Sequence, residues 1–176
     1  QDHRTDAMRL AWETDGNLAV PRVAWGPAGA APATESLAVR SIVVNDSHVV
    51  HVAEATDLLA ATAYDYRVSN GDTVSETWTF RTAPPLDAQT VRVGWLADNQ
   101  EGAERFATHL SHLVPREPDL FFVAGDMVSD PARLSEWREY WWGPLVDAAD
   151  FGSQTPVLVA RGNHDLHHPY AYAYVQ

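Results

Sequence analysis

The spacing of apolar residues changes abruptly at Pro84-Pro85, and this change constrains the fold more than any other feature of the sequence. Before the proline pair, apolar residues recur in short alternating runs separated by turn sequences rich in glycine, asparagine and aspartate. After it, longer apolar runs alternate with segments of helical spacing. We therefore expect two domains, at residues 1–84 and 88–176, joined by a short linker.

The first domain is predicted to be all-β. Candidate strands, each with apolar residues at every second position or in a short run, cover residues 8–12, 20–25, 39–44, 49–53, 64–68 and 77–81. Short strands with frequent turns are typical of two sheets packed as a sandwich. No long helix is predicted before residue 84.

The second domain shows the order strand, helix, strand, helix, strand. Apolar runs at residues 91–97, 120–124 and 157–160 are candidate buried strands. Residues 101–114 form one candidate helix, and residues 133–142 form another that is expected to end near Gly143-Pro144. This alternation predicts a parallel sheet with crossover helices. The predicted fold class is therefore multidomain, β followed by α/β.

Each of the three apolar runs in the second domain ends in residues that can bind a metal ion. In chain order these residues are Asp98, Gln100, Asp126, Asn163, His164 and Asp165. Because the carboxyl ends of parallel strands meet at one edge of a sheet, we expect these residues to converge. A carboxylate at Asp126 can bridge two cations, with Asp98 on one side and the amide oxygen of Asn163 on the other.

Each of these residues taken singly also has a structural explanation. An aspartate that follows a strand is commonly a helix cap or a turn residue, and for Asp98 alone capping is the better explanation. Asparagine and aspartate also tolerate left-handed backbone conformations and shape loops. Their joint occurrence at three successive strand ends favours a metal site.

Three sequence blocks resemble the calcineurin-like metallophosphoesterases, in particular the branch that contains the purple acid phosphatases. These blocks are residues 94–100, 121–126 and 156–165. Residues 58–84 are similar to the fibronectin-like domain that precedes the catalytic domain in that branch. The resemblance implies a fibronectin III-like sandwich followed by the first β-α-β-α-β part of a metallophosphoesterase α/β sandwich.

The same resemblance implies metal-dependent hydrolysis of phosphate monoesters or diesters at a dinuclear centre, with metal-activated hydroxide. Asp98 would bind the first metal ion, Asp126 would bridge both, and Asn163 would bind the second. His164 would stabilise the phosphoryl group or protonate the leaving oxygen, with Asp165 as its orienting partner. Mixed oxygen and imidazole ligands suit manganese, iron or zinc and do not choose among them.

Two positions depart from the family pattern. Gln100 stands where many members have a histidine ligand, so the first metal ion is held less tightly or Gln100 does not ligate. Ser129 stands where purple acid phosphatases have the tyrosine that binds ferric iron and gives the colour. The sequence therefore predicts a colourless enzyme.

The family's later histidine ligands have no counterpart in the sequence, which ends eleven residues after Asp165. His167 and His168 lie too close to the Asn163 block to take over those roles. These observations predict a fragment of a longer protein that binds metal ions weakly and turns over slowly or not at all by itself.

Composition limits the partners. The chain has 12 basic residues, all arginine, against 24 acidic ones, for a net charge of −12, which argues against nucleic acid and anionic membranes. Without cysteine, disulfides and thiolate zinc sites are excluded. No apolar run approaches the roughly 20 residues of a membrane helix. We expect a small phosphate-ester substrate, and the sequence indicates no oligomeric state.

Alternatives to the hydrolase remain. One is an extracellular binding or adhesion protein whose second domain is a degenerate phosphoesterase scaffold, an idea that Gln100 and Ser129 favour. Another is a cytosolic phosphoprotein phosphatase, which the leading sandwich disfavours because in the family that domain goes with export. The resemblance thus implies a secreted, periplasmic or cell-surface protein, although the first residues carry no apolar signal sequence.

Other aromatic and histidine clusters have structural explanations. Trp137, Trp141 and Trp142 are predicted to pack a helix against the sheet or cover a domain interface rather than bind sugar. His48 and His51 are predicted to face opposite sides of one strand, so they cannot act as a pair of ligands.

Overall fold

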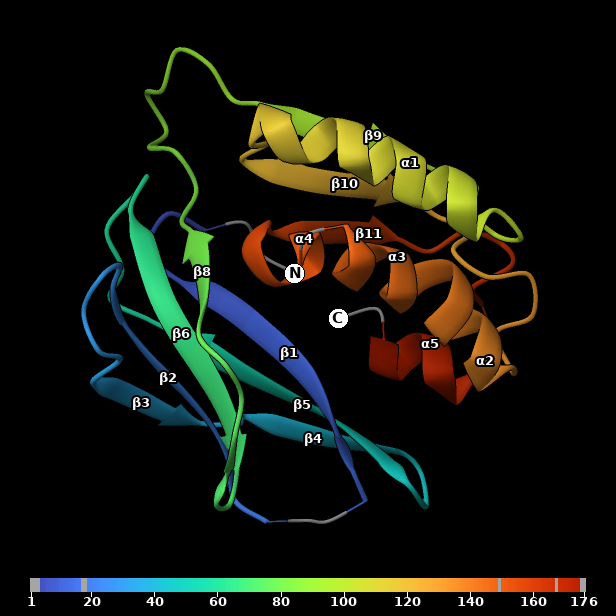
Figure 1. Ribbon diagram of the computed structural model, residues 1–176, viewed down its shortest axis with the longest axis horizontal. Helices are drawn as coiled ribbons and strands as arrows, with labels where there is room; N and C mark the ends of the chain where they lie inside the picture. Colours follow the sequence, from blue (N-terminus) through green and yellow to red (C-terminus); the bar gives the residue numbers. More distant parts are fainter. Residues whose placement is uncertain (1–3, 17–18, 149, 167, 175–176) are drawn as a thin grey trace. The chain divides into compact units, whose positions relative to one another are not determined.

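The computed structural model describes residues 4–16, 19–148, 150–166 and 168–174 (Figure 1). Its contacts divide the chain into two compact units, of which one ends at Ala88 and the other begins at Gln89. No helix in these described ranges is long and apolar enough to cross a membrane.

The first unit consists of two antiparallel sheets. Its strands are β1 (Met8–Asp15), β2 (Pro21–Pro27), β3 (Thr34–Leu37), β4 (Arg40–Asn45), β5 (His48–Ala55), β6 (Ala63–Asn70), β7 (Thr73–Val74) and β8 (Trp78–Arg81). One sheet has the order β1-β5-β4, and the other has the order β3-β2-β6-β7 with β8 also paired to β6. The predicted β domain is confirmed. The sequence did not indicate β3 and β7, because both are short and largely exposed.

The core of this unit lies between the two sheets. Leu10 of β1 and Ala53 of β5 pack in one cluster with Trp25 of β2 and Tyr66 of β6. Phe80 of β8 completes the cluster, with its ring centroid 5.6 Å from that of Tyr66. Apolar side chains two positions apart in β1, β2, β5 and β6 therefore meet at one shared core, as the alternating pattern predicts.

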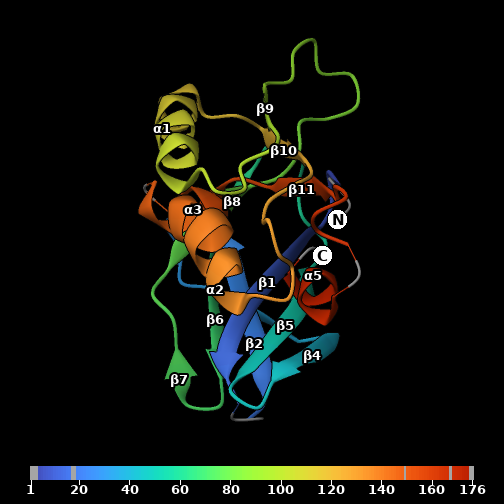
Figure 2. The ribbon, with the colours of Figure 1, turned by 90° about the vertical axis from the view of Figure 1, so that its right-hand side faces the viewer.

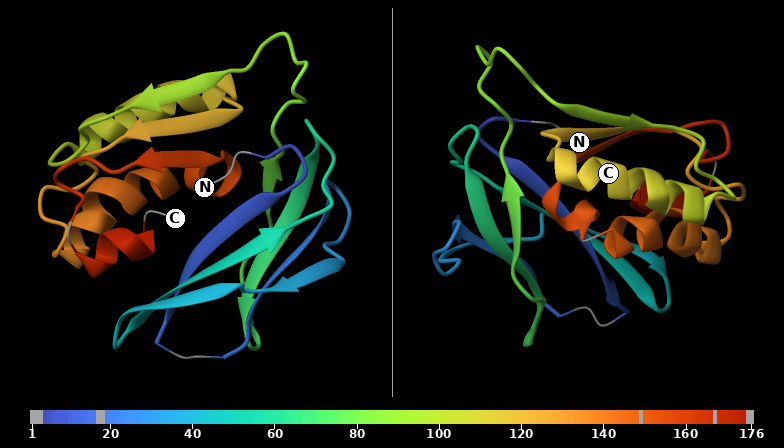
Figure 3. Two further views of the ribbon diagram at one scale, coloured as in Figure 1. Left: turned by 180° about the vertical axis from the view of Figure 1, so that it is seen from behind. Right: turned by 45° about the horizontal axis from the view of Figure 1, so that its top comes forward.

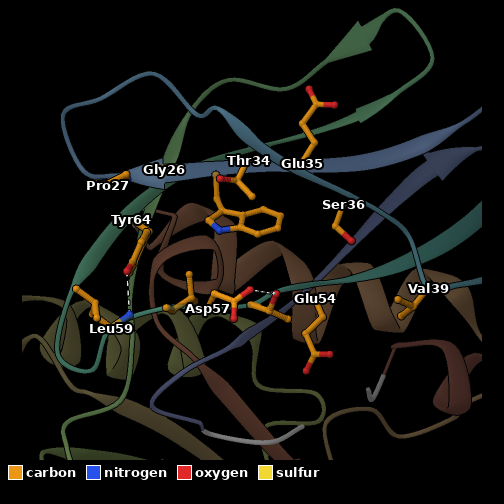
Figure 4. Close-up of a pocket in the computed structure, with 13 residues that line it drawn as sticks. Gly26, Pro27, Thr34, Glu35, Ser36, Val39, Glu54, Asp57, Leu59 and Tyr64 are labelled. Carbon is orange, nitrogen blue, oxygen red and sulfur yellow. Dashed lines mark hydrogen bonds between the residues drawn. The ribbon is translucent and has the colours of Figure 1, made fainter.

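A cavity of about 700 Å³ opens in the same unit (Figure 4). Trp25 and Tyr64 line it together with the acidic residues Glu35, Glu54 and Asp57. The Tyr64 hydroxyl accepts a hydrogen bond from the backbone N–H of Leu59 at 2.9 Å, which ties β6 to the cavity wall.

Two histidines of β5 have different surroundings. His48 is half-buried, and its Nδ1 lies 3.0 Å from Oε1 of Glu13. His51 is only 1% exposed, and its ring nitrogens contact the hydroxyls of Thr14 at 2.9 Å and Ser41 at 2.7 Å. Burial lowers the pKa of the His51 imidazole because the charged ring would lose its hydration.

We expect His51 to make the first unit less stable in acid. The His51 imidazole of the unfolded chain binds a proton near pH 6.5, whereas the folded imidazole stays neutral to lower pH. The contribution of the neutral His51 to the free energy of unfolding is therefore complete above about pH 6.5 and declines below it. Urea unfolding between pH 7 and 5, followed by amide resonances of β5, should show this decline. The decline should be smaller in His51→Gln and retained in His48→Gln. Equal pH dependence in His51→Gln and the native chain would contradict the assignment.

The second unit is an α/β layer. Its elements are β9 (Val93–Leu96), α1 (Ala103–Leu113), the 3-10 helix η1 (Val114–Arg116), β10 (Leu120–Ala124), α2 (Leu134–Glu136), the π-helix η2 (Trp137–Trp142), α3 (Gly143–Asp147), α4 (Phe151–Gln154), β11 (Val157–Ala160) and α5 (Pro169–Tyr174). Both strand pairs in the order β11-β10-β9 are parallel. The predicted parallel sheet is confirmed.

Helices cover the central strand of this sheet. Figure 2 shows α1 and α3 on one side of the three strands. The ring of Phe121 in β10 lies between Phe106 of α1, with centroids 6.3 Å apart, and Phe151 of α4, with centroids 5.3 Å apart. Phe121 and Val123 of β10 are 0% exposed, which agrees with the expected buried strand. Val93 and Trp95 of β9 are 54% and 67% exposed, so the prediction of a buried strand is wrong for β9.

The second predicted helix does not end near Gly143. It continues as α2, η2 and α3 to Asp147, so this boundary prediction is wrong. A Cβ on Gly143 would lie 2.8 Å from the carbonyl oxygen of Arg138, so the glycine lets the helix pass through at this point. Trp137 and Trp141 are 0% and 1% exposed, which confirms that they pack within the fold.

Candidate metal centre

The loops that follow β9, β10 and β11 meet at one edge of the sheet (Figure 3). Backbone hydrogen bonds join the first two loops: the N–H of Asp98 donates to the Gly125 carbonyl and that of Gln100 donates to the Asp126 carbonyl, both at 3.1 Å. The backbone N–H of His164 donates to Oδ1 of Asp126 at 2.9 Å. The structure therefore brings all three predicted ligand loops into direct contact.

Two glycines make this contact possible. A Cβ on Gly125 would lie 2.5 Å from the backbone nitrogen of Gly162 and 2.6 Å from its Cα. A Cβ on Gly162 would lie 2.5 Å from the backbone nitrogen of Asp126 and closer still to its carboxylate. Gly125 also has φ of +89°, a conformation that side chains disfavour. Only glycine at both positions permits the two loops to touch through their backbones.

Two of the predicted ligands have a left-handed backbone. Asp98 and Asp126 both have φ of +54°. Aspartate tolerates this region better than most residues, yet it remains a costly conformation that is concentrated at functional sites. The same turn follows both strands, so each carboxylate leaves its strand end in a comparable way.

The oxygen atoms of the predicted ligands are available for a cation. Among the residues that the structure describes, the exposed side chains of Asp98 and Asn163 make no hydrogen bond or ion pair. Oε1 of Gln100 is buried and has no hydrogen-bond partner in the described chain. A buried acceptor left unpaired costs about 1–3 kcal/mol, and a bound cation would remove this cost. These donors fit a metal ion that prefers oxygen ligands.

The donor set is nevertheless small. Nowhere in the described ranges do three or more histidine, aspartate or glutamate side chains gather in a way that could hold a metal ion. The edge offers the carboxylates of Asp98 and Asp126 and the amide oxygens of Gln100 and Asn163. The Nδ1 of His168 accepts the Tyr170 N–H at 3.3 Å, so this nitrogen is occupied and we do not count His168 among the ligands. His167 lies outside the described residues.

The side chain of Asp165 joins two of the loops through hydrogen bonds to their backbones. It is 0% exposed, and its Oδ2 accepts the backbone N–H groups of Asp126 at 2.8 Å and Gly162 at 2.9 Å. Its Oδ1 accepts those of Met127 at 2.8 Å and Val128 at 3.4 Å. Burial raises the pKa of this carboxyl, and the four N–H groups oppose the rise.

The contact expected between Asp165 and His164 is therefore not made. Both carboxylate oxygens of Asp165 are occupied by backbone donors, and the His164 side chain is exposed. Nδ1 of His164 instead lies 3.1 Å from the backbone carbonyl oxygen of Ser129. Because a carbonyl only accepts hydrogen bonds, this contact places the proton on Nδ1.

The sequence did not indicate that Asn99 and Glu136 are buried polar residues near the site. Asn99 is 6% exposed, and its side-chain amide donates to the carbonyls of Tyr140 at 2.9 Å and Met127 at 3.3 Å. Glu136 is 7% exposed and accepts the N–H groups of Ser129 and Asp130. The only sequence signal for Glu136 is its position three residues after Arg133, which can neutralise a buried acid.

Comparison with protein families agrees with both units. Residues 91–175 match the family described as calcineurin-like phosphoesterase. Residues 1–82 match the family described as purple acid phosphatase, N-terminal domain. No curated protein sequence matches the chain significantly.

The solved structures that resemble the fold include the following two. A purple acid phosphatase isolated from yellow lupin (Lupinus luteus) seeds has a TM-score of 0.74 and 17% identity over 98% of this chain. PhoD has a TM-score of 0.64 and 16% identity over 94% of this chain. The chain spans 37% of the length of the first protein and 38% of the second.

Proposed function

Because the chain belongs to the calcineurin-like phosphoesterases, with a purple acid phosphatase N-terminal domain ahead of the catalytic one, we propose that the protein hydrolyses phosphate monoesters or diesters. The observation that carries this proposal is the contact between the Gly125-Asp126 and Gly162-Asn163 loops beside Asp98. It gathers hard oxygen ligands at the carboxyl edge of a parallel sheet, where such folds bind their ligands.

We propose a centre of two metal ions, manganese, iron or zinc. Asp126 would bridge them, Asp98 and Gln100 would bind on one side, and Asn163 would bind on the other. When bound, such a pair polarises the phosphate and makes hydroxide available near neutral pH. The remaining ligands are expected from outside the described residues, because the edge offers only two carboxylates and two amides.

His164 is proposed to move the proton. With Nδ1–H held by the Ser129 carbonyl, Nε2 is the ring atom that can deliver a proton to the leaving oxygen. The exposed ring has room to meet a small phosphate ester. Asp165 contributes by fixing the backbone of the two loops, so its role is to position Asp126 and Gly162 rather than the imidazole.

Asp126→Asn is expected to lower metal-dependent hydrolysis by more than the roughly 10–100-fold typical of residues that only support a ligand. The amide keeps an acceptor for the His164 N–H but lacks the charge needed to bridge two cations. Turnover of an aryl phosphate monoester and diester with manganese or zinc, in protein that carries the remaining ligands, measures the effect. Asn163→Ala should act in the same direction.

Asp130→Asn is the matched control for this experiment. Its carboxylate binds Arg133 at 3.2 Å and is not among the proposed ligands, so activity should remain within about twofold of the native protein. Equal losses in Asp126→Asn and Asp130→Asn would contradict the bridging role.

The expected affinity for metal ions follows from the ligands that the described residues provide. A chain that offers two carboxylates should bind manganese or zinc weakly by itself, and its turnover should be slow or absent. Metal analysis after dialysis measures this directly. Two tightly held ions per chain would contradict the proposed need for further ligands.

The metal-loaded protein is expected to be colourless, even with ferric iron. No phenolate stands at position 129, where the Ser129 hydroxyl donates to Oε1 of Glu101 at 3.2 Å. The visible spectrum after loading with ferric iron tests this expectation. A strong charge-transfer band would show that another tyrosine binds the iron.

A binding protein with a degenerate phosphoesterase scaffold is the second candidate. The cavity beside Trp25 and Tyr64 in the first unit favours it, because three carboxylates and two aromatic rings line a concave surface (Figure 4). A metal-dependent assay of protein that carries the remaining ligands separates the two candidates, because a binding protein would show no hydrolysis with any metal. We also propose that the substrate is a small phosphate ester. We further propose that the protein acts outside the cytoplasm, which cell fractionation can test.

A further inference from the structure

Glu136 is a buried acid whose contacts point toward the proposed site. Its Oε2 accepts the backbone N–H of Ser129 at 3.0 Å and that of Asp130 at 2.8 Å. Its Oε1 accepts a hydrogen bond from Nη1 of Arg133 at 3.2 Å, which offsets part of the cost of burying the carboxylate. Because an unpaired buried carboxylate is costly, the two backbone donors hold residues 129–130 against Glu136.

One peptide group connects this carboxylate with His164. The N–H of Asp130 and the C=O of Ser129 belong to the same planar peptide bond and point in opposite directions. The N–H binds Glu136, while the carbonyl oxygen lies 3.1 Å from Nδ1 of His164. A carboxylate, a peptide group and an imidazole are therefore hydrogen-bonded in series.

Hydrogen bonds in series polarise one another. The negative charge of Glu136 draws on the Asp130 N–H, which makes the Ser129 carbonyl a stronger acceptor toward His164. The same contacts prevent rotation of the peptide plane, which would turn the carbonyl away from the ring. The charge of Glu136 thereby acts on the His164 imidazole through the peptide group, without a direct contact between the two side chains.

We propose that Glu136 is a positioning residue that acts through the Ser129–Asp130 peptide group to hold His164 in the Nδ1–H tautomer, with Nε2 directed to the ester. This inference rests on the proposed function, and it assigns to Glu136 the orienting role that Asp165 does not perform. The proton donor is the imidazolium form, which carries a proton on each nitrogen. The proton on Nε2 passes to the leaving oxygen, and the neutral ring that remains keeps its proton on Nδ1.

The tautomer of His164 can be measured without metal or substrate. Nitrogen chemical shifts of the neutral ring should report Nδ1–H in the native chain and in Asp130→Asn. Glu136→Gln retains an oxygen acceptor and should retain this tautomer. Glu136→Ala should move the ring toward the tautomer mixture of free histidine.

Two results would overturn the proposal. One is a native chain in which His164 carries its proton mainly on Nε2, a result that requires no variant to fold. The other is a folded Glu136→Ala variant whose ring still carries the proton on Nδ1.

Turnover gives an independent readout in the active protein. Glu136→Ala is expected to lower kcat by about ten-fold or more and leave KM unchanged, because the ester is still bound while the proton donor is misplaced. Unchanged kcat would contradict the positioning role. Absence of metal-dependent hydrolysis in protein that carries the remaining ligands would instead refute the proposed function, and the tautomer measurement is independent of that outcome.

Discussion

Gly162→Ala is expected to destabilise the second unit by about 3 kcal/mol or more, the upper range for overpacking a well-packed site. The new methyl group would lie 2.5 Å from the backbone nitrogen of Asp126 and closer to its carboxylate, so the two ligand loops must separate. Urea unfolding measures the loss of stability. The separation should also abolish metal binding, since it would move the loop that carries Asn163 away from Asp126.

Gly102→Ala is the control for this experiment. The added Cβ would meet the Asn99 carbonyl oxygen at 3.4 Å, an ordinary contact, in the loop that follows Asp98. We expect a change of less than about 1 kcal/mol. Comparable stability of the Gly162→Ala and Gly102→Ala variants would mean that the two loops do not touch through their backbones.

Asp165→Asn is expected to cost about 3–5 kcal/mol of stability, as does removal of one partner from a buried charged network. Each oxygen of Asp165 accepts two backbone N–H groups. An asparagine offers one oxygen, so its amino group must face two donors whichever way it is turned. Thermal or urea unfolding of the chain measures the effect.

His164→Ala separates the structural role of Asp165 from a catalytic one. The His164 side chain is exposed, so its loss should change stability by less than about 1 kcal/mol while it lowers turnover. A folded, equally stable Asp165→Asn variant with reduced turnover would restore the catalytic role that the sequence suggested for Asp165.

The parts of the fold predicted from the sequence are those with local signals. Strands β10 and β11 begin and end at the predicted residues because proline, glycine or a charged residue bounds each apolar run on both sides. The convergence of the three loops followed from parallel strand order alone. The end of the helix near Gly143 was mispredicted because glycine and proline usually end helices. Here Gly143 follows a π-helix, and its backbone lies so close to the Arg138 carbonyl oxygen that a side chain would not fit.

The supporting residues of the site could not be predicted in the same way. The partners of Asp165 are backbone N–H groups up to 39 positions away, and those of Glu136 lie in a loop whose conformation no periodicity encodes. Sequence identifies which side chains can act as ligands or proton donors. Which of them contact each other depends on backbone geometry at Gly125 and Gly162, and this geometry exists only in the folded chain.

The proposed metal edge is tested most directly by paramagnetic broadening with manganese. In amide spectra of the isotopically labelled chain, resonances of residues 98–100, 126–129 and 162–165 should broaden first, even if binding is weak. The selective broadening should disappear in Asp126→Asn and persist in Asp130→Asn. Broadening that centres on the acidic residues of the first unit, or that is unchanged in Asp126→Asn, would contradict the proposal.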